Sequence, residues 1–380
     1  MSTRIVLVGG FLGAGKTTLL LEAAERLAAR GYRVGMVTND QGEDLVDTAL
    51  GHEATVPVTE VAGGCFCCRF PDLLTSLQHL QEVVAPHVIL AEPVGSCTDL
   101  VATVLRPLVQ FYGEQYELAP LTVLLDGTRS ITDFSPNVHY LYQQQLAEAE
   151  LILLNKKDLL TSGELEAEQA RNQEIFPQAR VLAISAKRGD GLDTWLDVVL
   201  GQSSANPEAL LIDYERYAEA EAALGWLNAK GQVRASKAYS PRQWITDLFT
   251  SLDRFCGQNN CPIAHVKTLV MDPPTLGDSH AADQLVAPCG DVARLLQPTR
   301  MKASLTDSSS TISWDVEHST LEVTAHQFIL NARVHTEPAR LEQMAMQAIE
   351  RAKPEPGARW YIENFECFSP LPPQPTYRLP

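Results

Sequence analysis

Ten residues near the start of the chain, 9–18, constrain its fold more than any other segment. They read Gly-Gly-Phe-Leu-Gly-Ala-Gly-Lys-Thr-Thr. The apolar run 4–8 before them is typical of a buried parallel strand, and the helix-forming run 19–27 after them contains neither glycine nor proline. The residues that fill the pattern G-x-x-x-x-G-K-[ST] are Gly10, Gly15, Lys16 and Thr17. Strand, glycine loop and helix in this order predict a phosphate-binding loop.

The chemistry of such a loop explains its composition. Glycines let successive backbone N–H groups point at phosphate oxygens, and the helix N-terminus adds its dipole. Lys16 would reach the β- and γ-phosphates, and the Thr17 hydroxyl would hold Mg²⁺. We therefore expect a bound nucleoside triphosphate. The predicted nucleotide contacts of this loop are Gly10, Gly13, Ala14, Gly15, Lys16, Thr17 and Thr18.

Composition excludes several classes of partner. The chain has 380 residues with 47 acidic against 30 basic side chains, a net charge of −17, so we expect neither nucleic acid nor a membrane surface as a partner. No run of about 18 apolar residues is present, and the first strand begins too early for a signal peptide. These features predict a cytoplasmic protein. Eight cysteines in that compartment indicate metal or redox chemistry rather than disulfides.

Short apolar runs alternate with helical stretches through the first half of the chain. This alternation predicts an α/β fold: a P-loop NTPase with a mostly parallel sheet and helices on both faces. Ligand-binding loops should then lie at the carboxyl ends of the strands. The strands expected here are 4–8, 33–38, 56–61, 87–91, 121–126, 151–154 and 180–184.

The order of predicted strands and helices changes after residue 205, and this change predicts a second domain. We expect a P-loop domain over 1–205, a linker helix within 206–225, a smaller α+β domain over 226–368 and a proline-rich tail over 369–380. The runs 312–318 and 321–334 are typical of a β-hairpin in the second domain. We predict neither a helix nor a strand over residues 272–307.

The quartet Asn155-Lys156-Lys157-Asp158 follows one of the predicted strands and matches the N-K-x-D base reader of GTPases. A carboxylate at its last position can accept two hydrogen bonds from guanine, which adenine cannot offer. A second base-contacting loop should follow about 27 residues later. On its own the quartet could be a chance turn, but in register with a phosphate loop it favours GTP over ATP. The predicted base contacts are Asn155, Lys156, Asp158, Ser185, Ala186 and Lys187.

Glu92 and Gly95 follow a further buried strand in the sequence Glu-Pro-Val-Gly. A carboxylate there can reach Mg²⁺ through water, and the Gly95 N–H can contact the γ-phosphate. We count Glu92 with Lys16 and Thr17 as catalytic residues. A helix-capping glutamate followed by a turn glycine is the alternative.

Three thiols lie within four residues at Cys65, Cys67 and Cys68, directly after two glycines. Thiolates favour soft or borderline metals such as Zn²⁺ or Cu⁺. No second C-x-x-C supplies a fourth ligand, so a redox pair and inert core cysteines remain alternatives. Cys256, Cys261 and His265 fall in the other predicted domain, and Cys97, Cys289 and Cys367 are expected to be isolated core residues.

Taken together, these motifs resemble those of the CobW-like metal-chaperone GTPases, which are related to the hydrogenase and urease maturation GTPases. The resemblance covers about residues 4–200 and rests on the phosphate loop, the N-x-x-G-E segment 39–43, G-G-C-F-C-C, E-x-x-G and N-K-x-D. It implies that Cys65, Cys67 and Cys68 bind zinc or a similar divalent transition metal. It also implies a switch role near Mg²⁺ or the transferred metal for Glu43, with Asp40 as a further metal ligand.

The chain departs from the family at two places. Asp40-Gln41 replaces the usual Glu-Phe, and Glu92-Pro93-Val94-Gly95 is closer to the hydrogenase-maturation form. The resemblance as a whole implies a GTP-hydrolysing metallochaperone that delivers its metal to a client metalloprotein, with homo-oligomerisation left open. The alternatives are a GTPase chaperone for a cobalamin-dependent enzyme and a non-catalytic metal sensor or scaffold.

Overall fold

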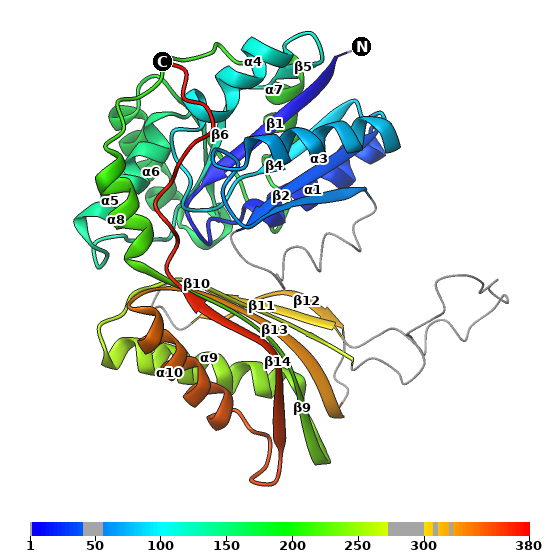
Figure 1. Ribbon diagram of the computed structural model, residues 1–380, viewed down its shortest axis with the longest axis vertical. Coiled ribbons are helices and arrows are strands. Elements are labelled where there is room, and N and C mark those ends of the chain that lie inside the picture. The colour runs from blue at the N-terminus through cyan, green and yellow to red at the C-terminus, as the bar shows by residue number, and fades with distance from the viewer. Residues whose placement is uncertain (1, 41–55, 273–299, 307–310, 319–321) are drawn as a thin grey trace, which may run out of the picture. The chain divides into compact units, whose positions relative to one another are not determined.

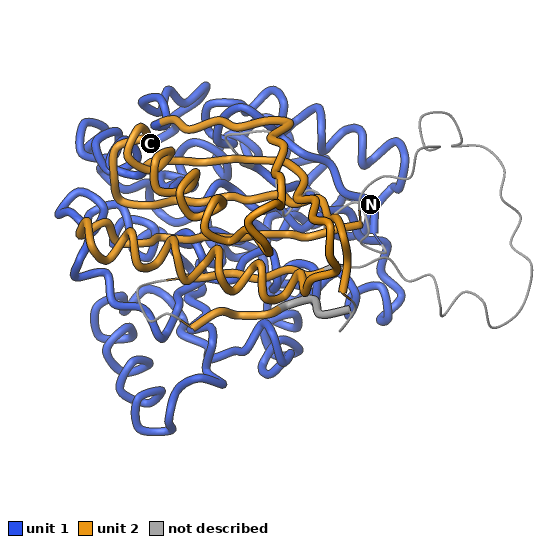
Figure 2. Tube along the Cα trace, turned by 90° about the horizontal axis from the view of Figure 1, so that it is seen from below, with its two compact units in different colours: residues 1–224, 369–380 blue, residues 225–368 orange. Residues whose placement is uncertain are grey.

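The computed structural model describes residues 2–40, 56–272, 300–306, 311–318 and 322–380. The chain divides into two compact units, coloured separately in Figure 2. Unit 1 comprises Met1–Leu224 together with Ser369–Pro380, and unit 2 comprises Gly225–Phe368. Residues 206–224 and the segment 369–380, predicted as a linker and a tail, are both part of unit 1.

Unit 1 is built on a sheet of eight strands in the order β3-β2-β4-β1-β6-β7-β8, with β5 also paired to β1 (Figure 1). The recorded strand pairs of this sheet are all parallel. Strands β4, β6 and β7 are buried along their whole length, as their continuous apolar sequences predict. The strands are β1 (Thr3–Gly10), β2 (Val34–Asp40), β3 (Val58–Ala62), β4 (Val88–Glu92), β5 (Tyr116–Leu118), β6 (Thr122–Asp126), β7 (Leu151–Asn155) and β8 (Arg180–Ala183).

Helices connect these strands and cover the sheet. Local sequence signals set several of their starts: Ser135 caps α5 ahead of Pro136, and Thr161 forms a capping box with Glu164 at the start of α6. Alternate residues of β1 lie on opposite faces, and Val6 and Val8 share one core with α1 and α7. The helices are α1 (Lys16–Ala29), α3 (Phe70–Val83), α4 (Arg106–Tyr112), α5 (Pro136–Ala147), α6 (Ser162–Ile175), α7 (Leu192–Gly201) and α8 (Tyr214–Ala222), with a π-helical turn at Val101–Leu105 and a 3-10 turn at Lys157–Leu159.

Unit 2 is an α+β domain with a six-stranded sheet in the order β12-β11-β10-β13-β9-β14. The recorded pairs are antiparallel, and helices α9 and α10 share a core with the sheet in which Trp244, Phe249 and Phe328 are buried. Its elements are β9 (Leu224–Tyr239), α9 (Pro241–Gln258), β10 (Ile263–Met271), β11 (Arg300–Leu305), β12 (Ser313–His318), β13 (Val323–His335), α10 (Pro338–Arg351) and β14 (Arg359–Phe368). Both parts of the predicted fold class are therefore confirmed.

The predicted hairpin of 312–318 with 321–334 is wrong. Strand β12 pairs with β11, and β13 pairs with β10 and lies next to β9, so two strands separate β12 from β13. The error arose because β11 was not recognised: its sequence, Arg-Met-Lys-Ala-Ser-Leu, has only three apolar residues at alternate positions. With β11 present, β12 pairs with the strand that precedes it in the chain.

Candidate nucleotide and metal site

The glycine loop turns the chain from the end of β1 into the first turn of α1. Gly10, Gly13 and Gly15 have φ values of 129°, 77° and 100°, which residues with side chains rarely adopt. Lys16 and Thr17 open α1 and are buried, and the Lys16 Nζ atom donates to the Gly10 carbonyl oxygen at 2.9 Å. A cation held over a glycine turn at a helix N-terminus suits a polyphosphate.

Asn155, the last residue of β7, joins this loop to the second base loop. Its Nδ2 atom donates to the Ala14 carbonyl oxygen at 2.8 Å, and its Oδ1 atom accepts from the Ala186 N–H at 2.9 Å. The side chain is buried, so both hydrogen bonds are shielded from water. Asn155, the first residue of the predicted base reader, thus connects the phosphate loop to the loop that contains Ala186.

Gly15 has no room for a side chain. A Cβ atom at this position would lie 2.5 Å from Asn155 Nδ2, and the backbone is in the left-handed region. We expect Gly15→Ala to lower the free energy of unfolding by about 1–3 kcal/mol and to weaken GTP binding at least about tenfold. Equilibrium unfolding and a fluorescent-GTP titration measure both effects. Gly31→Ala is the matched control, because Gly31 has a φ of 84° but no atom within 4 Å of the added Cβ; equal GTP affinity for the two variants would contradict the prediction.

Glu92 and Thr17 meet at the carboxyl ends of β4 and β1. The Thr17 hydroxyl donates to Glu92 Oε1 at 3.1 Å, and both side chains are buried. Two oxygen donors beside a phosphate loop form a donor set that fits Mg²⁺. Gly95 follows on the same segment and is packed against the phosphate loop, since a Cβ there would lie 2.7 Å from the Leu12 side chain.

The remaining base-reader residues lie beside one another after β7 and β8. The Lys157 N–H donates to the Ile184 carbonyl oxygen at 3.1 Å, which joins the two loops. Ser185 and Ala186 are buried, whereas Lys187 is exposed. The Asp158 side chain is 9% exposed, and its Oδ2 atom is 3.6 Å from Arg188 Nε. Thr18 is half-buried in the first turn of α1.

Asp126, at the end of β6, was not predicted as a site residue. Its Oδ2 atom is 2.6 Å from Lys156 Nζ, and its Oδ1 atom accepts from the Thr128 N–H and hydroxyl. Burial opposes the charge, but Lys156 and Arg129 outweigh it and lower the pKa of Asp126. The ion pair fixes the Lys156 side chain. A carboxylate that directly follows an apolar strand, as Glu92 does, was the available sequence signal.

Cys65, Cys67 and Cys68 form a compact thiol cluster in the turn between β3 and α3. Their sulfur atoms lie 2.6 Å (Cys65–Cys67), 3.2 Å (Cys65–Cys68) and 3.6 Å (Cys67–Cys68) apart. Cys65 and Cys67 are buried and Cys68 is half-buried. Among the described residues, this is the group of Cys, His, Asp and Glu side chains whose ligand atoms lie close enough together to hold a metal ion.

Asn39 of β2 fixes the conformation of the turn that carries the thiols. Its amide nitrogen donates to the carbonyl oxygens of Val61 and Gly64, at 2.7 and 2.6 Å, and its Oδ1 atom accepts from the Phe66 N–H at 2.9 Å. Sequence reasoning gave Asn39 no role of its own. Two predicted metal ligands near it cannot be placed: Glu43 lies outside the described residues, as does the side chain of Asp40, the last residue of β2.

The thiols influence one another's ionisation. Hydrogen bonds from Cys67 and Cys68 lower the pKa of Cys65, and the contact with Cys65 raises the pKa of Cys67. The hydrogen bond with Cys65 also raises the pKa of Cys68, to about 11. The contacts within the thiol cluster therefore favour ionisation at Cys65 over ionisation at Cys67 and Cys68, and a metal that binds the sulfurs as thiolates displaces the protons that they carry.

Cys97 is buried as predicted, and burial, together with the Cys65 thiol, raises the pKa of Cys97. The other cysteines are elsewhere. Cys256 and Cys261 are buried in unit 2 at the end of α9, and His265 lies in β10 of the same unit. Cys289 lies outside the described residues.

The C-terminal segment, residues 369–380, covers part of the thiol cluster. The Gln374 N–H donates to the sulfur of Cys68 at 3.2 Å. The Thr376 N–H donates to the Cys67 carbonyl oxygen at 2.8 Å, and its hydroxyl donates to the Cys68 carbonyl oxygen at 3.2 Å. In Figure 1 this segment, drawn in red, leaves β14 and runs back along unit 1. The thiol cluster is thus bounded by chain from two distant parts of the sequence.

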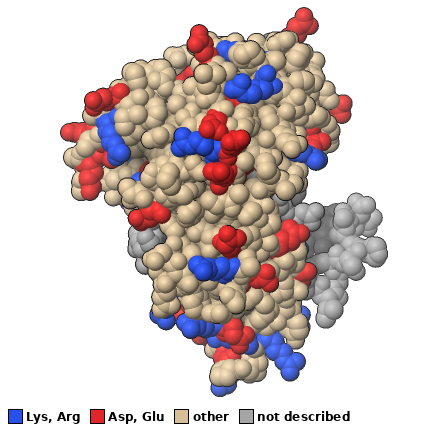
Figure 3. Space-filling model, turned by 60° about the vertical axis from the view of Figure 1, so that its left-hand side comes forward, with Lys and Arg blue, Asp and Glu red and all other residues tan. Residues whose placement is uncertain are grey.

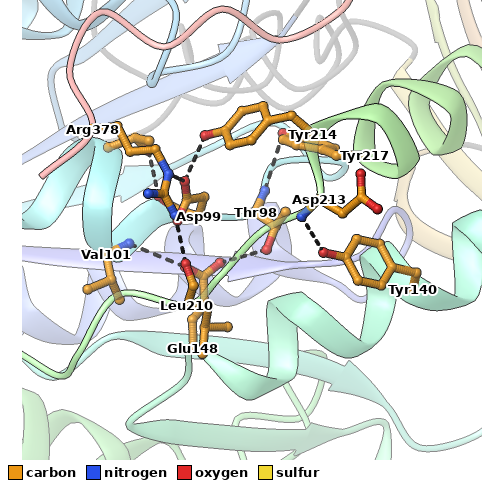
Figure 4. Close-up of polar contacts among 11 residues, drawn as sticks. Thr98, Asp99, Val101, Tyr140, Glu148, Leu210, Asp213, Tyr214, Tyr217 and Arg378 are labelled. Atoms are coloured by element: carbon orange, nitrogen blue, oxygen red, sulfur yellow. Dashed lines mark hydrogen bonds and ion pairs between the residues drawn. The ribbon is translucent and has the colours of Figure 1, made fainter. Parts of the chain in front are cut away.

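Two further contacts anchor the C-terminal segment. The Tyr377 ring lies 5.3 Å from the rings of Phe70 and Phe111. The Arg378 Nε atom is 2.8 Å from Asp99 Oδ2, to which the Tyr214 hydroxyl also donates at 2.7 Å (Figure 4). Asp99 is buried, so this ion pair is largely shielded from water.

A second buried acid, Glu148, holds the backbone on either side of Asp99. Its carboxylate accepts from the Thr98 hydroxyl at 3.1 Å and from the Val101 N–H at 3.2 Å (Figure 4). Burial raises the pKa of Glu148 to about 8, and the negative charge of Asp99 adds to the effect. The group is therefore protonated at neutral pH in the folded chain and ionised in the unfolded chain.

This difference predicts the pH dependence of stability. A pKa raised on folding contributes stability that is fully present below the unfolded pKa and is lost as pH rises toward about 8. We expect the free energy of unfolding of the wild type to fall over this range relative to that of Glu148→Gln, by up to about 1.4 kcal/mol per pH unit. Urea unfolding at pH 5, 6, 7 and 8 measures the difference. Parallel pH profiles for the two proteins would contradict it.

Two further features bear on partners. On the face of the molecule that Figure 3 shows, basic and acidic side chains are interspersed, and neither sign forms a continuous patch. Among the described residues, no helix combines the length and the apolar character needed to cross a bilayer.

A parallel sheet with a glycine loop between its first strand and helix, and an Asn-Lys-x-Asp loop at the same edge, defines a P-loop nucleotide-binding domain. Residues 4–183 match the family described as "CobW/HypB/UreG, nucleotide-binding domain". This part of unit 1 is therefore similar to the nucleotide-binding domain of that family, as the sequence motifs predicted.

Three curated relatives are similar to this domain. The zinc chaperone YjiA of Escherichia coli is 29% identical over 188 residues, covering 48% of this chain and 57% of its own. The zinc chaperone CobW of Pseudomonas aeruginosa is 28% identical over 222 residues, covering 49% and 57%. The hydrogenase maturation factor HypB of Escherichia coli is 27% identical over 187 residues, covering 49% and 58%. The chain thus spans less than two thirds of each of these relatives.

A solved structure, the Zn(II)-bound YjiA GTPase from Escherichia coli, matches 92% of this chain and 99% of its own, at 14% identity and a TM-score of 0.36. Those values are too low to bear on the arrangement of the site.

Proposed function

We propose that this protein is a GTP-hydrolysing metallochaperone. In this proposal it binds a divalent transition metal, zinc in the first place, at Cys65, Cys67 and Cys68 and delivers it to a client metalloprotein. The observation that carries the proposal is the compact thiol cluster, whose ligand atoms lie within 4.8 Å of one another in the same unit as the phosphate loop. Three soft ligands in reach of one ion suit zinc.

The order of strands at the carboxyl edge of the sheet supports a link between the thiol cluster and the phosphate site. Strand β2, which carries Asn39, pairs with β3 on one side and with β4 on the other. Asn39 binds the turn of the thiol cluster, and β4 ends at Glu92, which accepts from Thr17. Only one strand therefore separates the metal side from the Mg²⁺ side of the site. The names of two relatives, both zinc chaperones, agree with a metal role for this chain.

The proposed reaction assigns a task to each nucleotide-site residue. Lys16 neutralises charge on the β- and γ-phosphates, and Thr17 and Glu92 hold Mg²⁺, which supplies further charge neutralisation on the phosphates. The Gly95 N–H contacts the γ-phosphate, and Asp158 accepts from guanine N1–H and N2–H₂. Asp40 and Glu43 form the switch that orders with GTP and relaxes after hydrolysis. A cytoplasmic location, with neither nucleic acid nor membrane as a partner, belongs to the same proposal.

The coupling of the two sites can be tested by competitive Zn²⁺ titration with and without Mg²⁺–GTP. We compare the wild type, the triple variant Cys65→Ser/Cys67→Ser/Cys68→Ser and the control Cys256→Ser, which removes a buried thiol from unit 2. Reciprocal coupling predicts that Mg²⁺–GTP changes the Zn²⁺ affinity of the wild type and of the control by about fivefold or more. The triple variant should lose tight binding in both conditions. Identical affinities in all conditions would contradict the proposal.

Two other measurements separate the remaining alternatives. Multiple turnover of GTP distinguishes a GTPase from a nucleotide-dependent sensor or scaffold, which would bind GTP without hydrolysing it repeatedly. A chaperone for a cobalamin-dependent enzyme would keep full client activation in the triple serine variant, because its cysteines would be incidental.

A further inference from the structure

Cys68 is the accessible side of the thiol cluster, and the C-terminal segment lies directly against it. Cys65 and Cys67 are buried, whereas Cys68 is half-buried, so a solute approaches the three sulfurs from the side of Cys68. The Gln374 N–H donates to the Cys68 sulfur at 3.2 Å, which places the backbone of the C-terminal segment on this side. The segment therefore covers the thiol through which the cluster faces solvent.

Main-chain hydrogen bonds hold the C-terminal segment along unit 1. The Thr376 N–H donates to the Cys67 carbonyl oxygen at 2.8 Å, and its hydroxyl donates to the Cys68 carbonyl oxygen at 3.2 Å. Further on, the Leu379 N–H donates to the Ala102 carbonyl oxygen at 2.9 Å. The segment forms neither helix nor strand, because its prolines donate no hydrogen bond and favour an extended chain. Its position is therefore set by these contacts with unit 1.

An ion pair with a buried acid anchors the end of the C-terminal segment. The Arg378 Nε atom is 2.8 Å from Asp99 Oδ2, and Arg378 Nη2 donates to the Leu210 carbonyl oxygen at 2.7 Å (Figure 4). The Asp99 side chain is 1% exposed and that of Arg378 is 33% exposed, so the cation reaches the acid from the surface. Loss of the cation would leave a buried charge without compensation, which is strongly unfavourable. Asp99 therefore holds the segment in place through Arg378.

The C-terminal segment is anchored, but it remains at the surface of unit 1. The Tyr377 ring packs against Phe70, which opens α3 two residues after Cys68, and against Phe111. Tyr377 is nevertheless 40% exposed, and Phe111 is 47% exposed. Contacts with this much exposure can separate without opening the core of unit 1, so local opening of the segment costs less than global unfolding.

We propose that residues 374–379 are a strap that closes the accessible side of the thiol cluster, and that the ion pair between Arg378 and Asp99 keeps the strap closed. When the ion pair separates, the strap lifts from Cys68 and the sulfur becomes accessible to a metal or a reagent. The role of the strap in metal transfer rests on the proposed function, whereas its closure over Cys68 does not. The two can therefore be tested separately.

Alkylation of the metal-free, reduced protein by iodoacetamide tests the strap without a metal. Mass spectrometry gives the rate at Cys68 and, as an internal reference, at Cys367, a half-buried thiol of unit 2. Arg378→Ala should raise the Cys68 rate at least about tenfold over that of the wild type and leave the Cys367 rate unchanged. Arg171→Ala is the matched control, because it removes an arginine from an exposed ion pair with Glu168. Equal Cys68 rates in the two variants would overturn the proposal.

A synthetic peptide with the sequence of residues 372–380 separates a lifted strap from a general loosening of the chain. Added in excess to Arg378→Ala, it should restore slow alkylation of Cys68, because it supplies the cation that Asp99 lacks. The same peptide with alanine in place of its arginine should not. Protection by both peptides, or by neither, would overturn the role of the ion pair. A wild type that binds no Zn²⁺ would instead contradict the proposed function and leave the strap untouched, so the two failures are distinguishable.

Discussion

Asp158→Asn should lower the affinity of the protein for GTP at least about 100-fold and raise its affinity for xanthosine triphosphate. The carboxylate of Asp158 is 9% exposed and can accept from both guanine N1–H and N2–H₂. Two hydrogen bonds to a charged group are together worth ~3–6 kcal/mol, which corresponds to a factor of 100 or more. An amide offers one acceptor and one donor, so it matches xanthine, which carries a carbonyl oxygen where guanine carries the amino group.

Competition between the two nucleotides, measured by displacement of a fluorescent GDP, gives the ratio of affinities directly. Asp190→Asn is the control: it removes the same charge from an exposed position in the neighbouring loop, where the backbone carbonyl of Asp190 makes the structural contact. Retained GTP selectivity in Asp158→Asn would show that the base is read elsewhere.

Lys16→Ala should reduce GTP hydrolysis at least about 100-fold, because a single preorganised group that stabilises transition-state charge contributes 10²–10³ to the rate. Lys16 Nζ is buried over the glycine loop, 2.9 Å from the Gly10 carbonyl oxygen. Alanine removes the only charge that this side chain brings to the β- and γ-phosphates. Single-turnover hydrolysis at saturating GTP separates the loss of catalysis from the loss of affinity.

Lys157→Ala is the matched control for that experiment. Lys157 is also a lysine near the nucleotide site, but it opens the 3-10 turn and has no predicted nucleotide contact. We expect its hydrolysis rate to stay within about twofold of the wild type. A Lys16→Ala protein that hydrolyses GTP as fast as Lys157→Ala would remove Lys16 from the catalytic residues.

The parallel sheet and the nucleotide loops could be predicted from sequence because their signals are local. The φ values at Gly10 and Gly15 require glycine, and an apolar run such as 121–125 that ends in a polar residue identifies a buried strand and its functional end. The compact geometry of Cys65, Cys67 and Cys68 likewise follows from their spacing. Each of these features depends on fewer than about ten consecutive residues, so a single sequence contains the information.

Contacts between distant segments could not be predicted in this way. The hydrogen bond from the Thr376 hydroxyl to the Cys68 carbonyl oxygen is one example, because it joins residues 308 positions apart in the sequence. Strand β11 went unrecognised for a related reason: Lys302 is buried in it, so its apolar pattern is weak. The role of Asp126 is also non-local, since the partner that fixes its charge, Lys156, comes from the next strand. Such features depend on which strands lie next to one another, and the strand propensities of single residues do not give that arrangement.

In the proposed metal function, the contacts of the C-terminal segment with Cys67 and Cys68 bear on how fast a metal is released. The backbone N–H of Gln374 occupies the side of the Cys68 sulfur, and Thr376 holds the carbonyl oxygens of Cys67 and Cys68. In the proposed metal function, an acceptor that approaches Cys68 from this side would have to wait for local opening of residues 374–378, so the frequency of that opening would limit the rate of release. The segment would then control when the metal leaves, in addition to the binding strength that the sulfurs supply.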